Sequence, residues 1–329
     1  MKKLLFIVLS FLTFFAVAGD VKIVNVPGDM TVEKDGFKEI SIRNLADAEI
    51  YKVFGITLLD DHIYVLNHKP IGLYKLDLQG KVIGKTGGKG EGPGEFRSPW
   101  SLNKFRGKLL CSDFFVKIML YDRDLKLVEE IKFPSAVFID LVENKEGNII
   151  IPLRQISKSD KYFSLYSGDW KLSGYFGERP VRKDQKKSNQ DFVFYLDYDR
   201  EKDGIWAAFG DRYDLSYYEK EKLKTEIKEK NGHYKVTKLK DEKTGIVETE
   251  ILGRPVKLKI IKEKVYYFYG KEKDFYCDIF NKNSFKLLRR IRLERYYRRI
   301  AHYKDGIFYG LYYGLKGDDD YRLYRLELK

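Results

Sequence analysis

Few residues of this sequence have both the chemical type and the spacing that a catalytic site requires. Four histidines occur, and they share no spacing of metal ligands: His62, His68, His233 and His302. Cys111 and Cys277 lie in apolar runs without the signature of a nucleophile, so we expect buried thiols. No Gly-x-Ser-x-Gly motif is present, and a pair of catalytic acids cannot be placed from the sequence. These patterns predict no catalytic residue and no metal ligand.

The glycine-rich stretch at residues 84–99, GKTGGKGEGPGEFRSP, has the composition of a loop that cradles phosphate. It contains neither Gly-x-x-x-x-Gly-Lys-Ser/Thr nor Gly-x-Gly-x-x-Gly between a strand and a helix. Glycine and proline at this density exclude a helix or a central strand. We therefore predict a shaped linker between two strands.

A set of polar and aromatic residues in predicted loops could instead recognise a ligand. Aromatic and arginine side chains suit the binding of a sugar or a peptide, although ordinary packing uses the same types. The residues predicted to bind are Asn67, His68, Arg97, Trp100, Asp113, Arg154 and Tyr269.

The elements that position these residues are short strands separated by turns. The counts of Tyr and Phe, 25 and 22, favour strands over helices. Four strands are expected at residues 51–59, 63–67, 72–77 and 81–84, and a second set repeats them at residues 100–105, 109–113, 117–122 and 127–132. Four weaker copies follow, each with a turn before an apolar strand.

One apolar residue of the second strand marks each copy: Ile63, Leu109, Ile149, Ile205, Val265 and Ile307. Four strands in units separated by 46, 40, 56, 60 and 42 residues predict an all-β, six-bladed β-propeller with four-stranded antiparallel blades. The longer intervals need insertions, expected at residues 178–191 and 219–250, the second with an outer hairpin at 225–241. Five blades plus an insertion is the alternative.

Both ends of the chain bear on this ring. The last unit lacks an outer strand, and residues 38–43, which follow a first strand candidate at 21–26, can supply it and close the ring.

Residues 1–18 combine a basic start, a short apolar run and Ala16-Val-Ala18, which predicts a signal peptide. We expect residues 19–329 to form one monomeric propeller domain, periplasmic or extracellular, and not an integral membrane protein.

With the repeat established, residues 88–99 resemble the linker of NHL-type repeats, which has a Gly-rich turn, Gly-Pro-Gly-x-Phe and a proline before a strand. Leu109-Leu-Cys-Ser-Asp113 and Lys117-Ile-Met-Leu-Tyr-Asp122 resemble NHL strands. The chain looks like the exported six-bladed propeller proteins of bacteria. The motif match covers residues 51–133, and members of this kind are mostly uncharacterised, so the resemblance implies a fold more than a function.

The resemblance also raises a metal alternative. Propeller lactonases hold calcium with acidic and amide side chains in the central channel. Asn67 and Asp113 occupy equivalent positions that could do so here, while the later blades offer poor oxygen ligands. In NHL repeats this Asp often bonds to the following turn, and we favour that structural role for Asp113.

The formal net charge of +13 would suit an anionic polymer or membrane surface, but lysines alternate with glutamates along the chain, which favours a lysine-rich composition. Export argues against a nucleic-acid partner. We predict a non-enzymatic binding module that needs no cofactor and recognises a protein, peptide or glycan through one face of the ring. The alternative is a lactonase-like hydrolase or lyase with a divalent ion such as Ca²⁺ in the channel.

Overall fold

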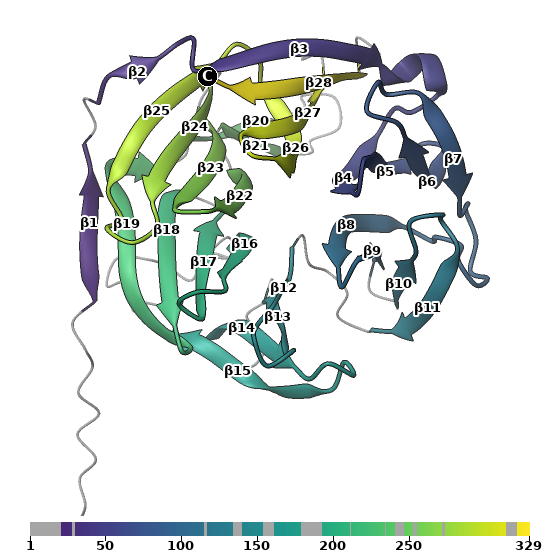
Figure 1. The fold of residues 1–329 in the computed structure, drawn as a ribbon, viewed down its shortest axis with the longest axis horizontal. Coiled ribbons are helices and arrows are strands. Elements are labelled where there is room, and N and C mark those ends of the chain that lie inside the picture. Colours follow the sequence, from purple (N-terminus) through teal and green to yellow (C-terminus); the bar gives the residue numbers. More distant parts are fainter. Residues whose placement is uncertain are drawn as a thin grey trace, which may run out of the picture.

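A computed structural model describes residues 21–27, 30–114, 117–133, 140–153, 161–178, 193–210, 212–233, 235–240, 247–252, 255–271, 274–313 and 321–329. Six blades, each of four antiparallel strands, stand side by side around a central axis, and two of them carry one added parallel strand on their outer edge (Figure 1). The predicted six-bladed, all-β propeller is confirmed, and the five-bladed alternative is wrong. The predicted signal peptide lies outside the described residues. Within those residues the one helix is a short 3-10 turn, η1 (Leu45–Ala48).

Successive strands of each blade run from the centre of the ring outward. The first three blades contain β4 (Val53–Leu59), β5 (His62–His68), β6 (Ile71–Leu76), β7 (Val82–Thr86); β8 (Pro99–Phe105), β9 (Lys108–Asp113), β10 (Lys117–Tyr121), β11 (Leu127–Lys132); β12 (Val142–Glu143), β13 (Ile149–Pro152), β14 (Lys161–Tyr166) and β15 (Leu172–Glu178). The last three contain β16 (Val193–Asp199), β17 (Gly204–Phe209), β18 (Arg212–Glu219), β19 (Lys222–His233); β22 (Pro255–Ile261), β23 (Lys264–Lys271), β24 (Asp274–Asn281), β25 (Leu287–Leu293); β26 (Tyr297–Lys304), β27 (Ile307–Tyr313), β28 (Tyr321–Leu328) and β3 (Phe37–Asn44).

The N-terminal segment runs along the outside of three blades, in purple in Figure 1. Its strand β1 (Lys22–Val26) pairs in parallel with β19, β2 (Val32–Glu33) pairs in parallel with β25, and β3 pairs antiparallel with β28. The β3 pairing covers residues 38–43, the segment that the sequence assigns to the last blade. The segment thus covers outer strand edges that would otherwise be free to pair with another chain.

The charged insertion after β18 differs from the prediction. The expected hairpin at residues 225–241 is wrong, because Thr225 belongs to the outer strand β19, where it faces Tyr217 of β18 on one side and Lys22 of β1 on the other. The hairpin lies further on and is formed by β20 (Lys235–Lys240) and β21 (Val247–Leu252). Of the other predicted insertion, at residues 178–191, all but the first residue lies outside the described residues.

The core consists of apolar layers between neighbouring blades. Tyr64 and Leu66 of the first blade, for example, pack in one cluster with Leu109 and Cys111 of the second. Both cysteines are free and fully buried, as the sequence predicts. Because each blade packs on two others, the innermost strands are held in fixed register around the axis.

The glycine-rich stretch is the linker between the first two blades, as predicted. Phe96 is fully buried, and its backbone bonds to Gly88 and Gly90 at 2.8 and 3.1 Å hold the loop around it. Gly87 and Gly94 have φ angles of 72° and 75°, a region that favours glycine. The linker therefore serves to connect and fix two blades.

Candidate functional site

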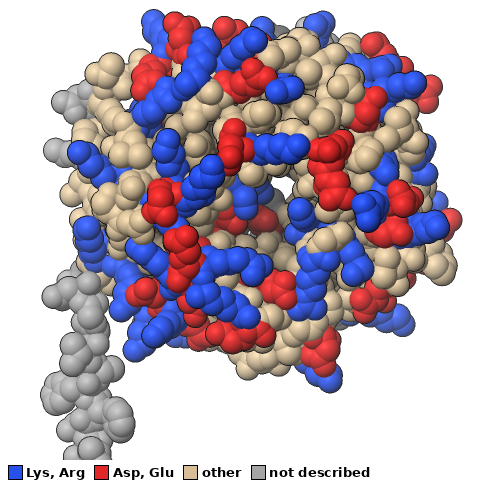
Figure 2. Space-filling model, viewed as in Figure 1, with Lys and Arg blue, Asp and Glu red and all other residues tan. Residues whose placement is uncertain are grey.

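A cavity of about 940 Å³ lies on the ring axis and is lined by the inner strands of all six blades. The contributing segments are residues 56–58 of β4, 102–105 of β8, 140–143 around β12, 196–199 of β16, 257–260 of β22 and 301–304 of β26. Each innermost strand lines the cavity with its C-terminal half, so the cavity lies at the end where these strands turn outward. Figure 2 shows an opening at the centre of the ring.

Charged side chains gather in this cavity in pairs. Lys259 Nζ lies 3.0 Å from Asp197 Oδ1, and Asp197 Oδ2 accepts a hydrogen bond of 2.5 Å from the backbone of Ile260. Lys257 Nζ lies 3.6 Å from Asp140 Oδ2. Burial raises the pKa of Asp140, and the ammonium of Lys257 opposes that rise. The ligand-facing wall is therefore ionic and nearly neutral.

His302 adds a titratable group to the same wall. Burial, helped by the charge of Lys259, lowers the pKa of His302 to about 4. Its Nε2 is buried and has no hydrogen-bond partner in the described part of the chain. His302 is thus a neutral imidazole at pH 7, capable in principle of accepting or relaying a proton.

The rim of the cavity carries further ion pairs. Lys282 is buried and contacts Glu201 at 2.6 Å, Asp199 at 3.4 Å and Glu263 at 3.7 Å. Arg106 lies 2.6 Å from Glu143 on the opposite wall. Across the face in Figure 2, Lys and Arg are interspersed with Asp and Glu. That face has no single-sign field of the kind that would attract an anionic polymer.

Six of the seven predicted binding residues lie at the other end of the ring, and the seventh, Arg154, is outside the described residues. Asn67 pairs with Val53 at the start of β4, and Asp113 pairs with Pro99 at the start of β8. Tyr269 likewise pairs with Pro255, the first residue of β22. A strand of seven residues separates the two ends by about 20 Å.

Asn67 and Asp113 are both fully buried. Asp113 accepts hydrogen bonds from the backbone nitrogens of Arg97 and Ser98 at 2.8 and 2.6 Å. This fixes the end of the glycine-rich linker, which precedes Asp113, whereas the NHL resemblance implies a bond to the turn that follows it. The amide nitrogen of Asn67 donates to the carbonyl of Pro70 at 2.8 Å.

His68 and Trp100 do come together at that end. The ring of Phe54 stacks on Trp100 at 6.1 Å and meets His68 edge-on at 5.1 Å. Arg97 is exposed and pairs loosely with Glu91 at 3.8 Å. These half-buried rings lie together at that end, and the predicted binding role of these residues stays a prediction. Arg154 lies outside the described residues.

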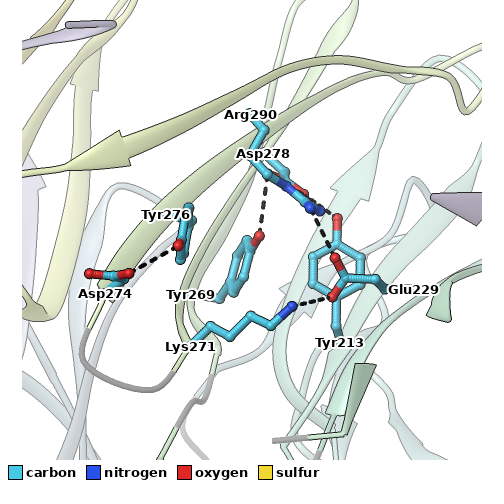
Figure 3. A network of polar contacts seen from close by, with 8 residues as sticks. All are labelled: Tyr213, Glu229, Tyr269, Lys271, Asp274, Tyr276, Asp278 and Arg290. Carbon is cyan, nitrogen blue, oxygen red and sulfur yellow. Dashed lines mark hydrogen bonds and ion pairs between the residues drawn. The ribbon is translucent and has the colours of Figure 1, made fainter. Parts of the chain in front are cut away.

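Tyr269 belongs to a buried network between the fourth and fifth blades (Figure 3). Arg290 donates to both oxygens of Asp278 at 2.9 and 2.8 Å, and to Glu229 of the fourth blade at 2.9 Å. Tyr213 and Tyr269 also donate to Asp278. With 1% of its surface exposed, Tyr269 serves this interblade contact.

The described residues contain neither a cluster of metal ligands nor a helix that could span a membrane. No three His, Cys, Asp or Glu side chains come close enough there to hold a metal ion. Nor does any helix in those ranges have the length and apolar character needed to cross a membrane.

The cavity was missed in the sequence because its residues look like ordinary strand and turn residues. Lys257 and Lys259 alternate with apolar residues, as on any half-exposed strand. The signal in the sequence is the position of these lysines within the repeat. They fall on the innermost strand of a blade, and the side chains of that strand that leave the core face the central channel instead of bulk water.

Comparison with known proteins gives the fold family. A family model described as a 6-bladed beta-propeller, DUF5128, matches residues 18–308. No curated protein matches the chain.

Solved structures share the fold at low identity. A Bacteroides fragilis protein named as a candidate exported protein aligns with a TM-score of 0.61 and 12% identity over 94% of this chain and 100% of its own. A DUF4221 member from Bacteroides vulgatus gives 0.59 and 11% over 91% and 98%. Virginiamycin B lyase from Staphylococcus aureus gives 0.53 and 13% over 89% and 100%. Identities this low show similarity of fold alone.

Proposed function

The chain belongs to the DUF5128 family of six-bladed β-propellers, and we propose that it is an exported, non-enzymatic binding module whose ligand enters the axial cavity. The observation that carries this proposal is the cavity itself, formed by all six innermost strands. Its volume of about 940 Å³ is in the range of small-molecule sites. A glycan or a peptide end would fit such a space.

The lining favours a polar ligand over an apolar one. The carboxylates and ammonium groups of two ion pairs, Asp197–Lys259 and Asp140–Lys257, line the cavity. Burying such polar groups under a ligand costs free energy unless the ligand offers them hydrogen-bond partners. A ligand with several hydrogen-bonding groups, such as a glycan or a peptide, can satisfy them. Export is supported by the predicted signal peptide and by the fold shared with a candidate exported protein.

A second candidate is a hydrolase or lyase, with or without a divalent ion. Its support is the pair of groups suited to proton transfer, Asp140 with a raised pKa and neutral His302, in one cavity. Virginiamycin B lyase shows that the fold can carry an enzyme. Turnover of a lactone or sugar panel, with and without added Ca²⁺, would favour this candidate.

The test is a screen of purified protein against glycan and peptide arrays. A hit is then compared between Thr57→Trp, which fills the cavity from β4, and Thr86→Trp, which adds the same bulk on the outer strand β7. We expect only Thr57→Trp to abolish binding. Equal binding by both variants would contradict the proposal.

A further inference from the structure

Two lysines on one strand of the cavity wall have unequal partners. Lys259 lies within 3.0 Å of both oxygens of Asp197, so its ammonium is hydrogen-bonded. Lys257, two residues earlier on β22, lies 3.6 Å from Asp140, beyond hydrogen-bond distance. The Lys257 ammonium carries three donors, and its contact with Asp140 is longer than the contact between Lys259 and Asp197.

Asp140 is held away from Lys257 by the backbone. Its Oδ1 accepts from the nitrogen of Leu141 at 3.1 Å, and its Oδ2 accepts from Leu196 at 3.4 Å. The side chain of Asp140 is 8% exposed and that of Lys257 is 22% exposed. The Lys257 ammonium also lies over the ring of Tyr195, 5.7 Å from its centre. A largely buried cation with one long carboxylate contact therefore lines the cavity.

We propose that Lys257 binds the carboxylate of a sugar acid in the axial cavity, while Asp140 accepts a hydrogen bond from a neighbouring hydroxyl of the same ligand. This inference rests on the proposed function and names the ligand class for that site. An ammonium–carboxylate hydrogen bond in a largely buried site is stronger than a neutral one.

The surrounding charges select a singly charged ligand. The two lysines and two aspartates of these pairs leave the part of the wall around Lys257 neutral before the ligand enters. One carboxylate adds a single negative charge beside Lys257. A phosphate would add nearly two, close to the carboxylates of Asp140 and Asp197, and the repulsion disfavours it. The same aspartates supply acceptors for the hydroxyl groups of a sugar, whereas a peptide would seek apolar pockets for its side chains.

The experiment is calorimetric titration of the purified full chain with the methyl glycosides of glucuronate and galacturonate, each of which carries one carboxylate. The neutral methyl glycosides of glucose and galactose and a dipeptide with a free carboxylate are the comparison ligands. We expect the acidic sugars to bind at least tenfold more tightly than the neutral ones. Lys257→Met should remove that preference. Lys132→Met, which alters an exposed lysine on the outer strand β11, should keep it.

The outcomes separate this inference from the proposed function. Equal affinity for acidic and neutral sugars, an unchanged preference in Lys257→Met, or tighter binding of the dipeptide overturns the sugar-acid assignment. If Thr57→Trp still blocked binding in any of these cases, the cavity would remain the ligand site although the sugar-acid assignment had failed. Absence of binding by every acidic sugar overturns the inference as well. Should Lys257→Met fail to fold by circular dichroism, the comparison of acidic with neutral sugars on the unmodified protein decides alone.

Discussion

Lys257 Nζ lies 3.6 Å from Asp140 Oδ2 across the axial cavity, and the two groups belong to the fifth and third blades. Asp140 also contacts the inner strand of the fourth blade, because the backbone nitrogen of Leu196 donates a hydrogen bond to it. Three blades therefore meet at one loosely made ion pair. The neighbouring pair Lys259–Asp197 is closer, at 3.0 Å, so Lys257 has more to gain from contact with a ligand.

Stability should depend on pH through His302. Its pKa is about 4 in the folded protein, against an unfolded value near 6.5. The unfolded chain thus binds the extra proton first, so the contribution of neutral His302 is complete above pH 6.5 and is lost as the pH falls towards 4. Because the side chain is only partly buried, we expect a loss of roughly 1–3 kcal/mol.

Urea unfolding at pH 7 and pH 4.5 measures this loss. The variant His302→Gln should show a smaller difference between the two pH values than the unmodified protein, since carboxylates common to both chains contribute equally. Identical differences would show that His302 does not titrate as its burial implies.

The interblade network should be a major determinant of stability. Asp278→Asn leaves Arg290 buried with three of its four hydrogen bonds weakened, and breaking a buried ion pair costs about 3–5 kcal/mol. Asp274→Asn changes a carboxylate in the same network that is 36% exposed and pairs with Arg292, so it should cost less than about 1 kcal/mol. Chemical denaturation of both variants makes the comparison, and equal costs would contradict the buried role of Asp278.

The glycine-rich linker should depend on Asp113. Asp113→Ala leaves the backbone nitrogens of Arg97 and Ser98 without their acceptor, which costs about 1–3 kcal/mol for a buried site. Asp122 accepts from two backbone nitrogens in the same way, at 2.9 Å each, but on the surface. Asp122→Ala should therefore cost less than about 1 kcal/mol. A larger effect in Asp122→Ala, measured by thermal unfolding, would refute the anchoring role.

The fold could be predicted from the sequence because its signals are local and repeated. Turns before apolar strands recur from Ile63 to Ile307, and the period alone sets the number of blades. The linker was identifiable since only a shaped loop tolerates so many glycines. The hairpin β20–β21 was misplaced because residues 219–250 are charged throughout, so no apolar alternation marks where β19 ends.

The site could not be predicted in the same way. A propeller has loops at both ends, and aromatic residues such as Trp100 drew attention to one of them. The cavity at the other end depends on which side chains of the innermost strands face the axis and how closely the strands approach it. That geometry comes from packing six blades together, a property that a single strand such as β22 does not encode.

The most direct test of the cavity as the binding site is to block each end of the ring separately. A single cysteine is placed at Thr57, in the cavity, or at Arg97, at the opposite end, and is labelled with a bulky maleimide; the native Cys111 and Cys277 are fully buried. Binding of the array hit is then measured before and after labelling. The account predicts that the label at position 57 abolishes binding and that the label at position 97 leaves it unchanged. Loss of binding with the label at position 97 alone would contradict it.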